Sequence, residues 1–324
     1  MQHLIPCATI AILLLVNLAT NAATPKIIIG EAKEINYVTH LYTLAGIGGE
    51  DAEYCSSYAG TLPQEAIDTL SHYSTYLQFG RTVNGVLAGP FFFGVASEDI
   101  PDREAMEAVV ERIIAESASQ PDGVKRACRA VGNVYVDNYQ HYLDSVYPRV
   151  KRQLAGRIDT LNAMLGENTI IADWQRVLGR KWEYGDYRFL LFRAGENSPS
   201  FNDLNKNTNT LYYNIETDFA MAMFSHEFGI FMMRDTIMPI FMEMRQKLEE
   251  DGRSPYIPWN AFESLACWYG CKIAGGESAD VKYFDRADVH TLMEIYNSLE
   301  KEGITDFPTL YRTAIARYIS RLEE

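Results

Sequence analysis

The chain has 324 residues, 47% of them hydrophobic, which is enough apolar sequence to bury a sizeable core in one large domain or two modest ones. Its formal net charge of −14 argues against nucleic acid as a partner, because phosphate binding needs a surplus of Lys and Arg. The same charge disfavours binding to an anionic membrane surface. These bulk properties favour a globular protein with an acidic, soluble surface.

Residues 1–23 have the features of a secretory signal peptide. The apolar run at 10–18 has the length of a signal-peptide core, and it is shorter than the roughly 20 residues of a comfortable membrane span. Small residues follow, so we expect cleavage near Ala22 or Ala23, export to the periplasm or the exterior, and no stable membrane insertion afterwards. No Lys or Arg precedes the run, so an uncleaved membrane anchor stays open as the alternative.

The four cysteines after this segment are too few for a disulfide scaffold. Cys55 and Cys128 can pair in an oxidising compartment, and the sequence leaves that pairing open. Cys267 and Cys271 are four residues apart in an apolar helical stretch, which places them on one helix face. That spacing more often means two buried thiols than a metal-binding pair.

The apolar periodicity predicts a helical N-terminal region at 24–167. Helices are expected at 34–45, from 64 towards 77, at 103–117 and through a long stretch to 165 that Pro148 breaks or kinks. The pattern changes near 168, and the second region, 168–324, is predicted to begin with strands. We expect strands near 187–193 and 209–215, a loop at 197–207, and helices at 218–233, 237–249, 258–274, 286–299 and 307–322.

One segment in the apolar helix at 218–233 carries a motif: Ser225-His226-Glu227-Phe228-Gly229-Ile230. In zinc hydrolases, His-Glu-x-x-His places two imidazoles one helical turn apart, about 6 Å along the axis, so that both reach one ion. The Glu then activates a zinc-bound water as general base. In this chain Ile230 stands where the second His would be, and its side chain has no lone pair to give.

The segment resembles the gluzincin-type zinc metallopeptidases, in particular an uncharacterised group of secreted bacterial proteins. His226 matches the first ligand, Glu227 the general base, and Glu263, 37 residues later, the third ligand on a returning helix. The resemblance covers about residues 185–275. It implies an α+β, predominantly helical fold with a zincin-like core, in which a small sheet packs on the His226 helix. In these enzymes an edge strand borders the substrate cleft, as the strand at 209–215 would.

Because Ile230 replaces the second zinc ligand, the resemblance implies a protein with impaired zinc peptidase activity. His226 and Glu263 form a partial or vestigial zinc site, and we expect zinc binding to be severely weakened. Our main hypothesis is an exported pseudoenzyme that binds a peptide or protein by β-augmentation along the strand at 210–215. Two alternatives stay open: an active zinc-dependent metallohydrolase with a non-standard ligand, or a helical binding module without a metal site. The oligomeric state is left open.

Overall fold

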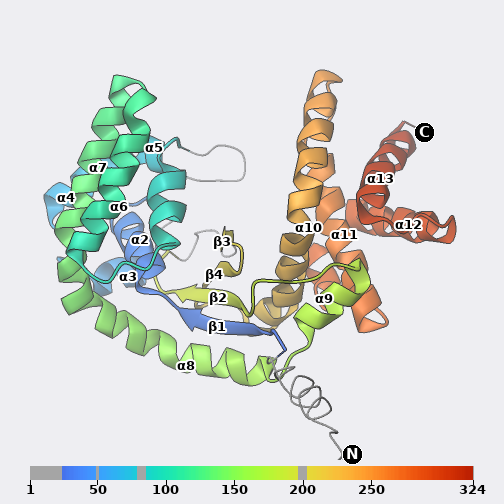
Figure 1. The fold of residues 1–324 in the computed structure, drawn as a ribbon, viewed down its shortest axis with the longest axis horizontal. Helices are drawn as coiled ribbons and strands as arrows, with labels where there is room; N and C mark the ends of the chain where they lie inside the picture. The colour runs from blue at the N-terminus through green and yellow to red at the C-terminus, as the bar shows by residue number, and fades with distance from the viewer. Residues whose placement is uncertain (1–23, 49–50, 79–84, 196–202, 324) are drawn as a thin grey trace, which may run out of the picture.

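The computed structural model describes residues 24–48, 51–78, 85–195 and 203–323 (Figure 1). The expected signal peptide and its cleavage site lie outside these residues. The fold is predominantly helical with one small mixed sheet, which confirms the α+β class. Among the described helices, none is both long and apolar enough to cross a membrane.

The sheet has the strand order β1-β2-β4-β3. Its strands are β1 (Ile27–Glu31), β2 (Tyr187–Phe192), β3 (Asp203–Asn205) and β4 (Thr208–Tyr212). β2 and β4 confirm the two strands that the sequence predicts, whereas β1 and β3 were not expected. β1, β2 and β4 are parallel, and β3 pairs antiparallel to β4 at the edge of the sheet. Because β1 belongs to the N-terminal region, the regions 24–167 and 168–324 share one sheet.

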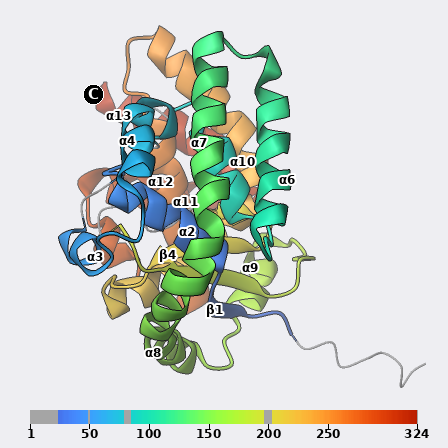
Figure 2. The same cartoon turned by 90° about the vertical axis from the view of Figure 1, so that its left-hand side faces the viewer.

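Helices lie on both sides of this sheet in Figure 1. The N-terminal region contributes α2 (Lys33–Leu44), α3 (Ala52–Ser57), α4 (Gln64–His72), α5 (Ser74–Leu77), α6 (Arg103–Glu116), α7 (Asp122–His141) and α8 (Tyr147–Leu165). The C-terminal region contributes α9 (Ile170–Leu178), α10 (Thr217–Glu250), α11 (Ile257–Ala274), α12 (Ala287–Lys301) and α13 (Phe307–Leu322). Four short helical turns complete the described elements: η1 (Gly89–Gly94), η2 (Ser117–Ser119), η3 (Tyr142–Val146) and η4 (Val281–Phe284). Figure 2 shows α6 and α7 side by side, and α8 contacts β1 along the sheet.

Two proline positions show how packing and backbone chemistry set helix ends. Pro148 lies in the first turn of α8, directly after the π-helical turn η3, and the stretch from 122 to 165 stays helical through this point rather than breaking at the proline. α10 differs from the prediction, because 217–250 is one helix rather than two, with Pro239 inside it. Met233, Ile237 and Phe241 are all buried at four-residue intervals across the expected gap. Their continuous contact with the core explains why the helix persists despite a proline.

Side-chain amides cover the outer edge of β1. The backbone N–H of Ile29 donates to Oδ1 of Asn162 at 2.9 Å, and the Asn162 amide donates back to the Ile29 carbonyl at 2.8 Å. Asn168 forms the same pair of bonds with Ile27, at 3.1 and 3.0 Å. The two amides therefore satisfy the backbone groups that a neighbouring strand would satisfy, which protects an edge that otherwise invites pairing.

The cysteines of the N-terminal region are not joined to each other. Cys128 is buried in α7, and the Sγ atom of Cys55 lies 3.6 Å from the carbonyl oxygen of Thr43. In the described part of the chain, no disulfide joins Cys55 to Cys128.

Candidate functional site

His226 lies on α10 with only 1% of its surface exposed, between two carboxylates. Its Nε2 atom lies 2.7 Å from Oε2 of Glu263 on α11, and its Nδ1 atom lies 2.8 Å from Oδ2 of Asp280. The structure thus brings together the two residues that the sequence predicts as metal ligands. If His226 and Glu227 only packed in a helical module, Glu263 would be expected far from His226. The observed contact of 2.7 Å does not support that alternative.

The charges around His226 favour its protonated form in the absence of a metal. Burial alone would lower the pKa of the imidazole, but hydrogen bonds with Asp280, Cys267 and Glu263 outweigh burial and hold it well above its ordinary value. Burial pushes the pKa of Asp280 upward, and its hydrogen bonds with His226 and Ser278 reverse that effect and leave it lowered. Phe284 stacks on the imidazole, with ring centroids 4.6 Å apart, and so fixes the plane of the ring.

Glu227, the expected general base, is partly buried beside this pair. Burial, together with the nearby charges of Glu263 and Asp203, raises the pKa of Glu227 to about 8. A general base must be ionised to accept a proton, so most Glu227 side chains are in the wrong protonation state at neutral pH. The charge of His226 pulls the pKa of Glu227 down, but burial outweighs it, so Glu227 is poorly suited to the role that the motif implies.

The residues on the Nε2 side do not fit an ordinary catalytic zinc. Such an ion normally has three protein ligands and a water, and here His226 and Glu263 supply two. Ile230, one turn after His226 in the position of the missing ligand, is 8% exposed and belongs to the hydrophobic core. The Nε2–Oε2 distance of 2.7 Å is a hydrogen-bond distance that would have to open to the roughly 3.3 Å between two ligands of one tetrahedral zinc, so the number of ligands, not this distance, is what the Nε2 side lacks.

Asp280 and Cys267 are the site residues that the sequence analysis missed. The Sγ atom of Cys267 lies 3.8 Å from Nδ1 of His226, and burial raises the pKa of this thiol to about 11. A thiol with that pKa is mostly protonated at neutral pH, which makes it a weak nucleophile. Asp280 lies in the segment between α11 and η4, where no local pattern in the sequence marks it. The four-residue spacing of Cys267 and Cys271 was the one available signal.

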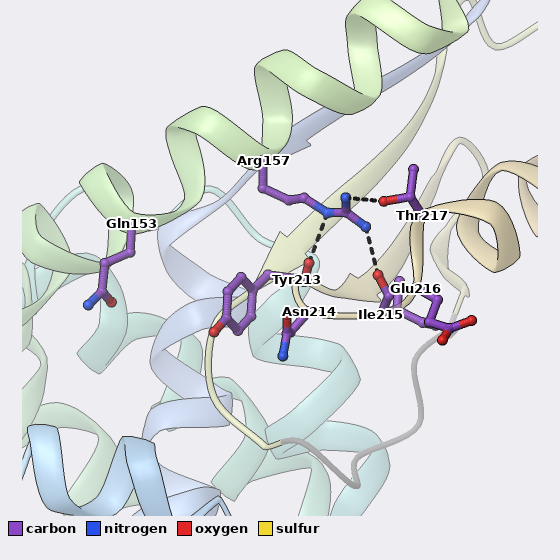
Figure 3. A pocket seen from close by; sticks show the side chains of 7 residues that line it. All are labelled: Gln153, Arg157, Tyr213, Asn214, Ile215, Glu216 and Thr217. Atoms are coloured by element: carbon purple, nitrogen blue, oxygen red, sulfur yellow. Dashed lines mark hydrogen bonds between the residues drawn. The ribbon is translucent and has the colours of Figure 1, made fainter.

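Two surface cavities are separate from this cluster. One, of about 370 Å³, lies between α8 and the segment that follows β4 (Figure 3). There the Arg157 guanidinium donates to the carbonyls of Tyr213 and Ile215 and to the hydroxyl of Thr217. These bonds hold the segment 213–217 against α8, so the guanidinium of Arg157 is already used and is not a free anion-binding group. The other cavity, of about 520 Å³, is lined by residues from 64 to 73 and by Ala130.

The expected binding strand is paired along one side. β4 overlaps the strand expected at 210–215 over residues 210–212, and it pairs with β2 along its length. On the other side, β3 pairs with Thr208 and Asn209, before the expected strand begins. β-Augmentation along 210–215 therefore stays a prediction. β3 is the antiparallel edge strand, and its Asp203 accepts a hydrogen bond from Arg234 of α10 at 2.8 Å.

Comparison of the chain with protein-family models, with curated proteins and with solved structures found no match.

Proposed function

We propose that this chain is an exported gluzincin-like protein that has lost ordinary zinc peptidase catalysis and binds a peptide or another protein. The observation that carries the proposal is the contact between His226 Nε2 and Glu263 Oε2 at 2.7 Å, with Ile230 buried one turn away. A returning helix presents a Glu to the His of the motif, as the resemblance requires. The ligand set beside it stays incomplete, which supports a loss of hydrolysis.

The edge strand β3 supports the binding half of the proposal. It lies antiparallel to β4 at the end of the sheet, and Asp203 ties it to α10 through Arg234. Tyr187 donates to Asp203 at 2.9 Å, and its ring lies against that of Phe228 with centroids 5.1 Å apart, so β3 lies near the motif. An extended peptide that pairs with the outer edge of β3 would therefore lie along the face of α10 that carries Glu227.

A peptidase assay combined with one restored ligand tests the loss of catalysis. The wild-type protein, supplied with Zn²⁺, is expected to cleave no member of a set of fluorogenic peptides. Ile230→His returns the missing imidazole and is expected to make Zn²⁺ binding depend on Glu263. Ile237→His is the matched control, since it places His at another buried position of α10, about 16 Å from His226 along the axis. Zn²⁺-dependent cleavage by the wild-type protein would instead establish the active metallohydrolase.

Hydrogen exchange tests the binding surface separately. Short synthetic peptides of random sequence are screened for binding, and a peptide that binds is added at saturation. Slower amide exchange at 203–205, with no change at 27–31, is expected, because Asn162 and Asn168 already cover the outer edge of β1. Protection confined to another surface, or a failure of every peptide to bind, would count against β3 as the binding edge.

A further inference from the structure

Three potential metal ligands gather on the Nδ1 side of His226. The Sγ atom of Cys267 lies 3.8 Å from Nδ1, and Oδ2 of Asp280 lies 2.8 Å from it. One nitrogen, one sulfur and one carboxylate oxygen thus lie within 4.8 Å of one another, and all three residues are buried. This group is distinct from the site that the sequence predicts, because Glu263 contacts the other ring nitrogen.

We propose that this cluster is a closed structural site for zinc or a similar divalent metal ion. Its ligands are the three clustered atoms, Nδ1 of His226, Sγ of Cys267 and a carboxylate oxygen of Asp280. Sγ of Cys271, which lies outside this group against Ser278, is the proposed fourth. Imidazole nitrogen, thiolate and carboxylate are the three ligand types that proteins use for zinc. The proposal goes beyond the peptide-binding function and does not depend on it, since a closed site holds the fold together rather than contacting a ligand.

The separations between the atoms suit one ion. Two ligands of a tetrahedral zinc lie about 3.6 Å apart for a sulfur and a nitrogen, and about 3.3 Å apart for a nitrogen and an oxygen. The observed Sγ–Nδ1 distance of 3.8 Å is close to the first value. The Oδ2–Nδ1 distance of 2.8 Å is a hydrogen bond that has to open by about 0.5 Å when the ion enters.

Cys271 supplies the fourth ligand from the next turn of α11. Its Sγ atom lies 3.5 Å from the hydroxyl oxygen of Ser278, and that hydroxyl donates to Oδ1 of Asp280. Cys271 therefore borders the same group of side chains, and it reaches the ion by exchanging its contact with Ser278 for the metal. Four protein ligands leave no open position for water, which is the arrangement of a structural zinc rather than a catalytic one.

The surroundings already provide the support that a metal-bound histidine needs. When Nδ1 binds the ion, the proton stays on Nε2 and is donated to Glu263, 2.7 Å away. A carboxylate on the second nitrogen is the usual partner of a metal-ligating imidazole, because it fixes the tautomer and the ring orientation. In this arrangement Glu263 positions His226 and does not itself touch the ion.

Co²⁺ titration of the whole exported chain, reduced and freed of metal with EDTA, tests the site directly. We expect one Co²⁺ per chain, with a near-ultraviolet thiolate-to-metal charge-transfer band, and full displacement of Co²⁺ by Zn²⁺. Because the ion binds the folded chain, removing it with EDTA is expected to lower the Tm. The absence of stoichiometric binding by the wild-type protein would overturn the proposal, whatever the outcome of the peptide assays.

Variants then decide which side of the imidazole holds the ion. Cys267→Ser and Asp280→Asn, which remove ligands, are each expected to weaken Co²⁺ binding by more than about 100-fold, and Glu263→Gln, which removes only the partner of the second ring nitrogen, by about 10- to 100-fold. Cys128→Ser, a buried cysteine on α7, is the matched control and is expected to change nothing. The opposite pattern, with binding lost in Glu263→Gln and kept in Cys267→Ser, would place the ion on the Nε2 side and overturn the proposal.

Cys271→Ser tests the fourth ligand. It is expected to reduce the charge-transfer intensity by about half, because one of two thiolates is lost. An unchanged band would show that Cys271 is not a ligand. Circular dichroism of each variant separates lost metal binding from lost folding, and the wild-type spectrum remains decisive if a variant does not fold.

Discussion

The indole of Trp174 on α9 packs so closely over Gly229 on α10 that a β-carbon at position 229 would lie 2.2 Å from the ring. The indole N–H also donates to the hydroxyl of Ser225 at 2.9 Å, one turn earlier on α10. These contacts hold α9 against the helix that carries His226. The glycine of the His-Glu motif is therefore required by packing.

Gly229→Ala is expected to lower the free energy of unfolding by about 1–3 kcal/mol, because the added methyl group overpacks the contact with Trp174. The better helix propensity of Ala, about 1 kcal/mol, only partly offsets this loss. Gly156→Ala on α8 is the matched control: its new methyl group meets no atom within 4 Å, so stabilisation by about 0.5–1 kcal/mol is expected. Urea denaturation measures both. Stabilisation by both substitutions would contradict the close contact.

The edge of β1 gives a second test of stability. Asn162→Ala removes both hydrogen bonds to the backbone of Ile29 and is expected to cost about 1–3 kcal/mol, because partly buried backbone groups lose their partners. Asn138→Ala is the control, since its amide donates only to the Val134 carbonyl within the same helix. We expect a change within about 0.5 kcal/mol there. Equal effects of the two substitutions in chemical denaturation would show that the amide does not protect the strand edge.

The N-terminal segment predicts export and cleavage. When the chain is produced in a bacterium with residues 1–23 intact, mass spectrometry of the exported fraction is expected to show a mature protein that begins directly after Ala22 or Ala23. Leu14→Arg interrupts the apolar run and is expected to leave an uncleaved precursor in the cell. Recovery of the full-length wild-type chain in the membrane fraction would instead support the membrane-anchor alternative.

His40 makes the stability of the fold depend on pH. Burial lowers the pKa of this imidazole to about 3, and its Nδ1 lies 2.8 Å from the hydroxyl of Tyr54. Between its ordinary value of 6.5 and about 3, the unfolded chain binds a proton that the folded chain does not. Acidification through this range therefore destabilises the fold by about 1.4 kcal/mol per pH unit, and above 6.5 the effect of His40 vanishes.

His40→Gln removes this proton linkage while other titrating groups stay the same. Urea denaturation at pH 7.5 and at pH 5.5 is therefore expected to show a loss of stability that is about 1.4 kcal/mol smaller in the variant than in the wild-type protein. The comparison uses the difference between the two pH values, so a general cost of the substitution cancels. An identical loss in the two proteins would mean that His40 binds its proton equally well when folded.

The sequence by itself determined the features that depend on neighbouring residues. Apolar periodicity and β-branched or aromatic runs indicated β2, β4 and the His226 helix, because helices and strands repeat their buried faces at fixed intervals. The resemblance to gluzincin-type metallopeptidases also indicated the pairing of His226 with Glu263, although they are 37 residues apart.

Only the tertiary structure decided which distant segments share a site. It placed β4 inside the sheet, covered the edge of β1 with Asn162 and Asn168, and brought Asp280 and Cys267 to Nδ1 of His226. Residues 226 and 280 are 54 positions apart, and no periodicity links them. Their contact follows from how α10, α11 and the segment before η4 bury their surfaces together. Packing of this kind sums many weak contacts over the whole core, so a local pattern cannot encode it.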